Sequence, residues 1–166
     1  MTRLNRFTPT ALISALVLSL LSTAAFAQVV DVKGAWARAT VQGQKATGAF
    51  MTLTAKDKTQ LVSVSSTVAG VAEVHEMKMD GDVMKMRALT NGLDLPAGKP
   101  VSLKPGGYHV MLMDLKLPLQ KDTTIPMTLV FKDAKGAQSN LAIMVPVSTT
   151  APAADAGAAG HADHKH

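Results

Sequence analysis

Short apolar segments interrupted by turn-forming residues constrain the fold of this chain more than any other feature. Between residues 29 and 147 these segments often alternate apolar with polar residues, and no stretch has a convincing helical period. This spacing predicts an all-β fold, an antiparallel β-sandwich with Greek-key connections. The predicted strands are Val29–Ala39, Ala49–Thr54, Leu61–Ser66, Val71–Met79, Val83–Ala88, Val101–Leu103, Tyr108–Leu115, Ile125–Phe131 and Leu141–Val147.

The N-terminal segment has the three parts of a secretory signal. Arg3 and Arg6 precede an apolar run at 11–21, and Ala25-Phe26-Ala27 matches an A-x-A cleavage site. The apolar run is too short to span a membrane, and no later stretch is long enough. We therefore expect residues 1–27 to be a cleaved signal peptide and the mature protein to be periplasmic. The alternative is an uncleaved N-terminal anchor.

The remaining chain divides into a folded domain and a tail. Residues 28–148 are long enough for one domain with a real core, of about 120 residues. Residues 149–160 are nearly all alanine, glycine, threonine and proline, which predicts a flexible linker. The linker ends in a His-rich tail, so 149–166 is the third region that we predict.

Composition excludes several classes of function. The chain has no cysteine, so it has no cysteine nucleophile, iron–sulfur cluster, Cys-ligated zinc or blue-copper site. Its formal charge is +5, or +3 without Arg3 and Arg6, and its lysines form no basic run. This pattern argues against nucleic-acid binding, although a weakly basic surface can favour an acidic protein partner.

The first of two methionine-rich segments runs from His75 to Met86. Its central Asp80-Gly81 predicts a two-residue type I′ hairpin turn, which places Met77 opposite Met84 and His75 opposite Met86. Side chains alternate along each strand, so five candidate ligands share one face: His75, Met77, Met79, Met84 and Met86.

The second segment contains His109, Met111 and Met113, which share one face of their predicted strand. It follows the tight turn Pro105-Gly106-Gly107. Because loops cluster at the ends of a sandwich, we expect these side chains to lie there, near the start of the strand.

Histidine and methionine together indicate a site for Cu(I). Thioether sulfur is soft and neutral, whereas zinc prefers thiolate, imidazole or carboxylate, and magnesium and calcium prefer oxygen. Both histidines of the predicted domain have a methionine two residues later, a coincidence that favours metal binding over structural roles. The strongest candidates are His75, Met86, His109 and Met111.

The other methionines have alternative roles. A methionine stripe is more often core than ligand, so we predict core positions for Met51, Met127 and Met144. Four more either bind Cu(I) as auxiliary ligands or shield the site: Met77, Met79, Met84 and Met113.

These residues resemble a known signature. His75, ten residues, Met86, twenty-two residues and His109-x-Met111 are similar to the motif of the PCuAC family of periplasmic copper chaperones. Gly34-Ala-Trp36-Ala-Arg38 and the stretch 93–113 are similar too. The family's usual second gap is one residue shorter, which places an insertion in the 90–98 loop.

The resemblance implies a cupredoxin-like fold and Cu(I) held by two histidines and two methionines. It also implies delivery toward the copper site of cytochrome c oxidase subunit II, alongside Sco-type proteins. We expect a monomer.

The tail offers a separate metal-binding segment at His161, His164 and His166. Imidazole-rich tracts bind Cu(II) without a preformed fold, so we favour a Cu(II) capture segment over the alternative of a solvated terminus. Transfer of Cu(II) to the His/Met site would need a reductant, and the chain has no thiol to supply one.

A metal carrier without catalytic turnover fits these features best. Copper oxygenases of the His-brace type need an N-terminal histidine, whereas the predicted mature N-terminus is Gln28. A structural sandwich would need no cluster of soft ligands. Copper sequestration shares all the chemistry of delivery, and copper reductase activity is a further alternative.

Overall fold

The computed structural model describes residues 30–152, which form strands and no helix. Within this range, no helix is long and apolar enough to cross a membrane. The predicted signal peptide and the His-rich tail lie outside the described residues. The strands are β1 Val30–Arg38, β2 Ala46–Ala55, β3 Thr59–Ser65, β4 Val71–Asp80, β5 Val83–Ala88, β6 Leu93–Leu95, β7 Pro100–Leu103, β8 His109–Met113, β9 Thr124–Asp133 and β10 Gln138–Ser148.

All nine predicted strands are present in the structure, and β6 is additional. Sequence reasoning missed β6 because a three-residue strand is too short to show an alternating pattern. It forms by pairing with Thr59–Leu61 of β3.

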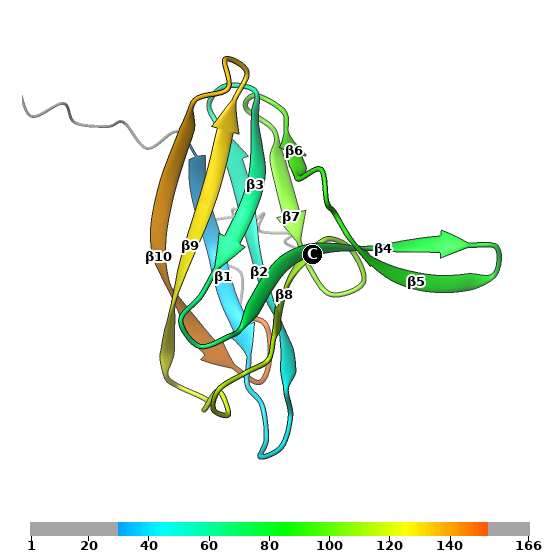
Figure 1. The fold of residues 1–166 in the computed structure, drawn as a ribbon, viewed down its shortest axis with the longest axis vertical. Coiled ribbons are helices and arrows are strands. Elements are labelled where there is room, and N and C mark those ends of the chain that lie inside the picture. The colour runs from blue at the N-terminus through cyan, green and yellow to red at the C-terminus, as the bar shows by residue number, and fades with distance from the viewer. Residues whose placement is uncertain (1–29, 153–166) are drawn as a thin grey trace, which may run out of the picture.

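The strands form a sandwich of two sheets (Figure 1). The first sheet has the order β5-β4-β8-β2-β1, with β7 also paired to β2, and the second has the order β10-β9-β3-β6. Antiparallel pairing predominates, as predicted. The sheets join along one edge where β1 and β10 run parallel, with Ala37 opposite Val147 and Arg38 opposite Ser148.

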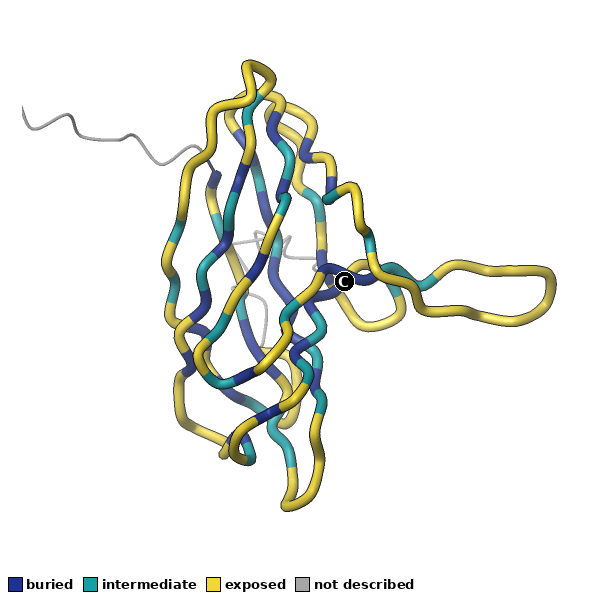
Figure 2. The backbone as a smooth tube through the Cα atoms, viewed as in Figure 1, coloured by how far each residue is buried: buried dark blue, intermediate teal, exposed yellow. Residues whose placement is uncertain are grey.

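The core lies between the two sheets and is formed by alternate residues of the strands that make up the sandwich (Figure 2). On β2 these are Ala49, Met51 and Leu53, and on β9 they include Met127 and Leu129. The predicted core positions of Met51 and Met127 are confirmed, since both are almost fully buried.

The predicted core position of Met144 is wrong, because its side chain is 61% exposed. Along β10, Val145 and Val147 point into the core, so Met144 points outward by the alternation of a strand. An apolar segment of this composition does not reveal which of its two faces is buried.

β7 and β8 lie end to end along one side of β2. β7 pairs with residues 51–54 of β2, and β8 pairs with residues 46–49, both antiparallel. Residues 104–108 bulge out between them, with Gly106 at a φ of 79°. His109 therefore lies at the start of β8 as predicted, but halfway along the sandwich. The expectation that it lies at the end is wrong. β7 and β8 together form one partner strand along β2, and the loop that interrupts this strand lies at the middle of β2 rather than at its end.

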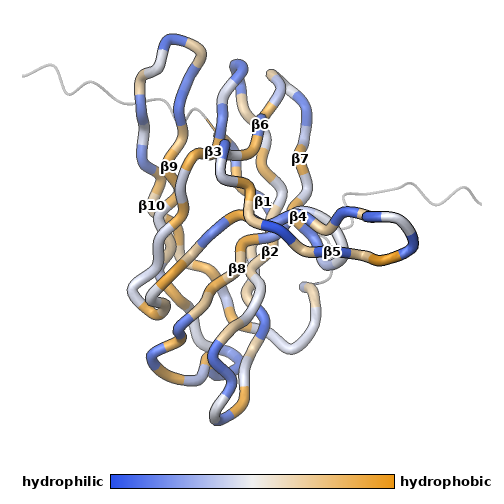
Figure 3. Tube along the Cα trace, turned by 45° about the vertical axis from the view of Figure 1, so that its right-hand side comes forward, coloured by the Kyte–Doolittle hydropathy of each residue, from blue (hydrophilic) through white to orange (hydrophobic). Residues whose placement is uncertain are grey.

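The hairpin of β4 and β5 projects from the sandwich as an arm (Figures 1 and 3). The pair His75–His109 is the last between β4 and β8, and beyond it β4 pairs only with β5. We call residues 76–88 the arm. Every residue of β5 is exposed.

The predicted register of this hairpin is wrong by two residues. The structure pairs Asp80 with Val83, so Gly81-Asp82 forms the turn, and Met77 lies opposite Met86. Gly81 has a φ of 62°, whereas that of Asp82 is not positive, which is the type II′ pattern with glycine first. A shift of two residues preserves the face of every side chain, so the predicted shared face of the histidine and the methionines is retained.

Candidate metal site

The two histidines of the described chain are direct neighbours across β4 and β8. His75 and His109 are paired, and their ring centroids lie 5.9 Å apart. Both are buried, although imidazole is polar, with exposed fractions of 8% and 7%. Their neighbours Val74 and Val110 point into the core, so the histidines lie on the outer face of the first sheet, where the arm begins.

The hydrogen bond of His109 determines which of its nitrogens is free. Nδ1 lies 3.0 Å from the carbonyl oxygen of Gly107. A carbonyl only accepts, so Nδ1–H is the donor, and Nε2 of the neutral ring carries a lone pair. This Nε2 lies 3.2 Å from the sulfur of Met86. Two atoms with lone pairs thus face each other at close range.

In His75 the free nitrogen is Nδ1, whereas in His109 it is Nε2. Nε2 of His75 lies 3.1 Å from a carboxylate oxygen of Glu73, so Nε2–H donates and Nδ1 carries the lone pair. That Nδ1 is buried and has no hydrogen-bond partner. Buried polar atoms are normally satisfied, so an unpaired lone pair on a histidine next to a second histidine requires an explanation.

A soft cation satisfies this arrangement. Two ligands at roughly 2.0 and 2.3 Å from one tetrahedral metal ion lie about 3.5 Å apart, close to the observed separation of His109 and Met86. Within residues 30–152, no group of three or more His, Cys, Asp or Glu side chains could hold a metal ion. The side chain in contact with a free histidine nitrogen is Met86, and its thioether sulfur is a soft ligand that suits copper.

The remaining methionines lie at different distances from the histidines. Met111 is half-buried on the same face of β8 as His109 and lies opposite Glu73 of β4. Met113 is four residues from His109, roughly 13 Å along a strand. The structure thus brings His75, Met86 and His109 into contact, places Met111 beside them and leaves Met113 apart.

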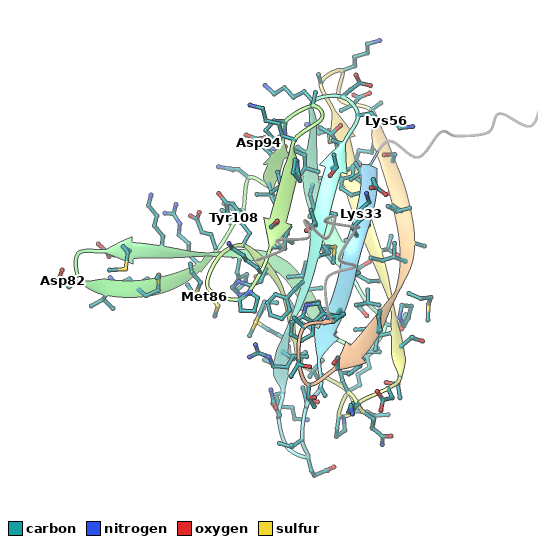
Figure 4. All side chains as sticks on the ribbon, turned by 180° about the vertical axis from the view of Figure 1, so that it is seen from behind. Lys33, Lys56, Asp82, Met86, Asp94 and Tyr108 are labelled. Atoms are coloured by element: carbon teal, nitrogen blue, oxygen red, sulfur yellow. The ribbon has the colours of Figure 1, made fainter. Side chains whose placement is uncertain are left out.

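The arm carries the other auxiliary candidates progressively farther from the sandwich. Met77 lies opposite Met86 at the base of the arm, and Met79 lies opposite Met84 near its tip. Figure 4 shows this separation, with Met86 beside the sandwich and Asp82 at the far end of the hairpin.

Sequence reasoning missed the aromatic residues beside the histidines. Trp36 and Phe50 are buried on the outer face of the first sheet, with ring centroids 4.7 Å apart. Phe50 also lies 6.5 Å from His109, between centroids, and the Arg38 guanidinium lies 5.7 Å from its ring. Phe50 lies in a segment of β2 whose neighbouring residues belong to the core, so its position in the sequence does not indicate that it contacts His109.

Glycine at position 48 makes room for this aromatic pair. A Cβ atom there would lie 2.7 Å from Cζ of Phe50, closer than real Cβ atoms approach. Gly48 also lies opposite Met111 across β2 and β8. The close packing of Phe50 against the backbone therefore depends on the absence of a side chain beside the candidate ligand.

Comparison with known proteins shows the family to which the chain belongs. Residues 30–147 match the family described as LpqE-like, putative lipoprotein LpqE-like. A putative lipoprotein of Leifsonia xyli subsp. xyli is 34% identical over 116 residues, 70% of this chain and 69% of that protein. An uncharacterized protein of Rickettsia prowazekii is 34% identical over 103 residues, 59% of this chain and 57% of that protein.

Solved structures share the fold. The solution structure of CuI-DR1885 from Deinococcus radiodurans has a TM-score of 0.56 and 31% identity, over 76% of this chain and 83% of that one. The copper-bound PCuAC domain from PmoF2 has a TM-score of 0.57 and 22% identity, over 74% of this chain and 95% of that one. These likenesses confirm the cupredoxin-like sandwich predicted from the sequence.

Proposed function

The chain belongs to the LpqE-like family and to the PCuAC domains that its sequence motif predicts, and from this premise we propose that it is a copper carrier. It binds one Cu(I) through His75, Met86, His109 and Met111, as cargo rather than as a resident cofactor. It acts in the periplasm as a monomer and has no catalytic turnover of its own.

The observation that carries the proposal is a pair of imidazole nitrogens that accept no hydrogen bond from an N–H or O–H group. Nδ1 of His75 and Nε2 of His109 both present lone pairs, and the sulfur of Met86 already lies beside the second. Imidazole and thioether are neutral ligands, so a monovalent ion adds the least charge to a half-buried site. Zn²⁺ is normally bound by thiolate, imidazole or carboxylate, and the thioether sulfur of Met86 is none of these.

The ligands differ in exposure, and this difference suits a carrier. The two histidines are buried and held by hydrogen bonds, whereas Met86 is 48% exposed. An acceptor can approach Met86 and replace its sulfur while the histidines still hold the ion. The known copper-bound form of the 31% identical Deinococcus protein supports binding of the same metal.

We further propose that the acceptor is the copper site of cytochrome c oxidase subunit II, reached alongside Sco-type proteins. The support is the family resemblance of the motif. The tail residues His161, His164 and His166, which lie outside the described residues, would capture Cu(II). Sequestration for copper tolerance uses the same site and differs only in where the metal goes.

The first test is the site itself. The purified protein, titrated anaerobically, should bind one Cu(I) with both sulfur and nitrogen neighbours in X-ray absorption. The variant His109→Ala should lose nitrogen neighbours and most of the affinity, while Met144→Leu should match the wild type. A spectrum with only nitrogen and oxygen neighbours would rule out the ligand set.

A second test separates delivery from sequestration. Cu(I)-loaded protein should transfer its metal to a purified oxidase subunit II domain in the absence of oxygen. A deletion strain starved of copper should lose oxidase activity. Normal oxidase assembly in that strain, together with sensitivity to excess copper, would favour sequestration.

A further inference from the structure

The arm exposes methionines that have no core to pack against. Met79 and Met84 are 53% and 50% exposed, and no strand other than β4 and β5 pairs with this part of the hairpin. Burial in a core is the usual reason for a methionine cluster, and here that reason is absent. Exposed thioethers on a projecting element therefore need another explanation.

The two faces of the arm have different chemistry. One face carries four thioethers, at Met77, Met79, Met84 and Met86, and Ala88 lies at its base opposite His75. The opposite face carries charged side chains, including the ion pairs Asp80–Lys85 and Glu76–Arg87. An isolated two-stranded hairpin is marginally stable, and these pairs across the strands support it from the charged face.

The thioether face consists of two rungs. Met77 lies opposite Met86, and Met79 lies opposite Met84. Directly opposed Cβ atoms in a sheet are about 5 Å apart, so two flexible thioethers can reach a single ion between them. Successive rungs are two residues apart, roughly 7 Å along the strands.

We propose that Met79 and Met84, with Met77 as a third ligand, form a second site for a soft monovalent cation, Cu(I) or Ag(I). This second site rests on the proposed function, since Met86 of the inner rung, Met77–Met86, is also a ligand of the His/Met site. Cu(I) moves between the sites when one Cu–S bond forms as another breaks. The ion keeps its oxidation state, so no electron or proton is transferred. The outer site presents the cation to a partner at the end of the arm.

The outer site should be the weaker one, because it has no imidazole and is exposed to water. We expect its affinity to be at least about tenfold lower, which corresponds to about 1.4 kcal/mol. The first equivalent of metal should therefore occupy the His/Met site and the second the tip.

NMR of the purified protein with ¹³C-labelled methionine methyls tests this order, with Ag(I) as an oxygen-stable probe. The first equivalent should shift the methyls of Met86 and Met111, and the second those of Met79 and Met84. Met144 is the matched control, because it is 61% exposed but has no methionine opposite it on β9. The methyl resonance of Met144 should not shift when two equivalents of Ag(I) are added.

The double variant Met79→Leu/Met84→Leu keeps the apolar volume of the face and removes both sulfurs. It should retain the first equivalent, lose the second and transfer Cu(I) to a soluble chelator severalfold more slowly. The variant Met144→Leu should behave as wild type in all three measurements. The arm does not contribute to the core, so circular dichroism should confirm that the double variant is folded.

The outcomes distinguish this proposal from the proposed function. If Met86 and Met111 respond to the first equivalent while Met79 and Met84 never shift, the second site is wrong and the carrier site stands. The exposed thioethers would then serve only as an apolar contact surface. If Met86 and Met111 do not respond, the proposed function fails instead. If Met144 shifts as much as Met79 and Met84, binding to exposed thioethers is nonspecific, and the second site is also overturned.

Discussion

At the scale of single residues, the site depends on which atoms have hydrogen bonds and which do not. Gly107 accepts hydrogen bonds from both Nδ1 of His109 and the backbone N–H of Met77. One carbonyl thus orients a histidine and the base of the arm together. Glu73 orients the second histidine, so neither ring can turn without losing a bond.

Replacing either methionine of the His/Met site should weaken Cu(I) binding with little effect on stability. Leucine conserves volume, and such replacements usually cost under about 1.5 kcal/mol even in a core. We expect Met86→Leu and Met111→Leu to lower the affinity strongly in a competition assay with a Cu(I) chelator. The controls Met51→Leu and Met127→Leu, both in the core, should leave it unchanged. Wild-type affinity in Met86→Leu would contradict the ligand set.

Glu73 should act as a positioning residue for His75. We expect Glu73→Leu to lower Cu(I) affinity about tenfold, the lower end of the effect of losing a bond to a ligating histidine, because Glu73 is half exposed. Glu73→Gln retains an acceptor oxygen and should restore most of the affinity. ¹⁵N shifts of the imidazole report the tautomer. If the tautomer populations of His75 in Glu73→Leu are the same as in the wild type, Glu73 does not position this histidine.

At the scale of elements, strand β2 brings the aromatic pair, the glycine and the core together. Its inward residues fill the sandwich, while Gly48 and Phe50 point to the opposite face beside His109. The interrupted β7–β8 partner strand then places the histidine at the middle of β2. The site is thus built on regular strands with a single loop beside it.

The variant Gly48→Ala should disturb this packing. The added Cβ would lie within 3 Å of a buried ring, and overpacking of this kind typically costs about 1–3 kcal/mol. We expect a lower denaturation midpoint and a weaker Cu(I) site, because Phe50 must move beside His109. Gly107→Ala, where a Cβ would meet only ordinary contacts at 3.7 Å, is the control for stability. Equal midpoints for both variants would show that Phe50 tolerates the methyl group.

At the scale of the whole molecule, the hydrophobic core and the metal site are separate. The core cluster lies between the sheets and includes neither histidine, whereas the candidate ligands lie on the outer face and on the arm. The packing of the sandwich core therefore involves none of the candidate metal ligands.

The protein should remain folded without metal. A chelator should leave the strand signal in far-UV circular dichroism unchanged, since the core is complete without copper. Cu(I) should still raise the unfolding free energy by mass action, about 2.7 kcal/mol when free metal is a hundredfold above Kd. Loss of the strand signal in chelator would show that the metal is structural.

Deletion of residues 160–166 should separate the two oxidation states of copper. We expect the truncated protein to lose Cu(II) uptake and to keep its Cu(I) affinity, because the His/Met site lies within the sandwich and arm. Isothermal titration with each ion would measure both. Equal Cu(II) uptake with and without the tail would reject its role in capture.

How much could be predicted depends on the range of the interaction. Alternation along a strand is local, so the all-β class and the shared face of His75, Met77 and Met79 follow from the sequence. The chemistry of the ligands is local too, because a thioether is soft wherever it lies. A two-residue error in the hairpin turn left these conclusions intact, since side chains repeat every second residue.

Only the tertiary structure decided which residues meet. The pairing of His75 with His109 and the contact of Phe50 with His109 join strands that are far apart in the sequence, and no local pattern encodes them. The exposure of Met144 likewise depends on which face of β10 packs against the first sheet. The sequence by itself determined the kind of ligands and the strands that carry them. The packing of the sheets decided their distances, because burial and hydrogen bonds are properties of the assembled layers rather than of any segment.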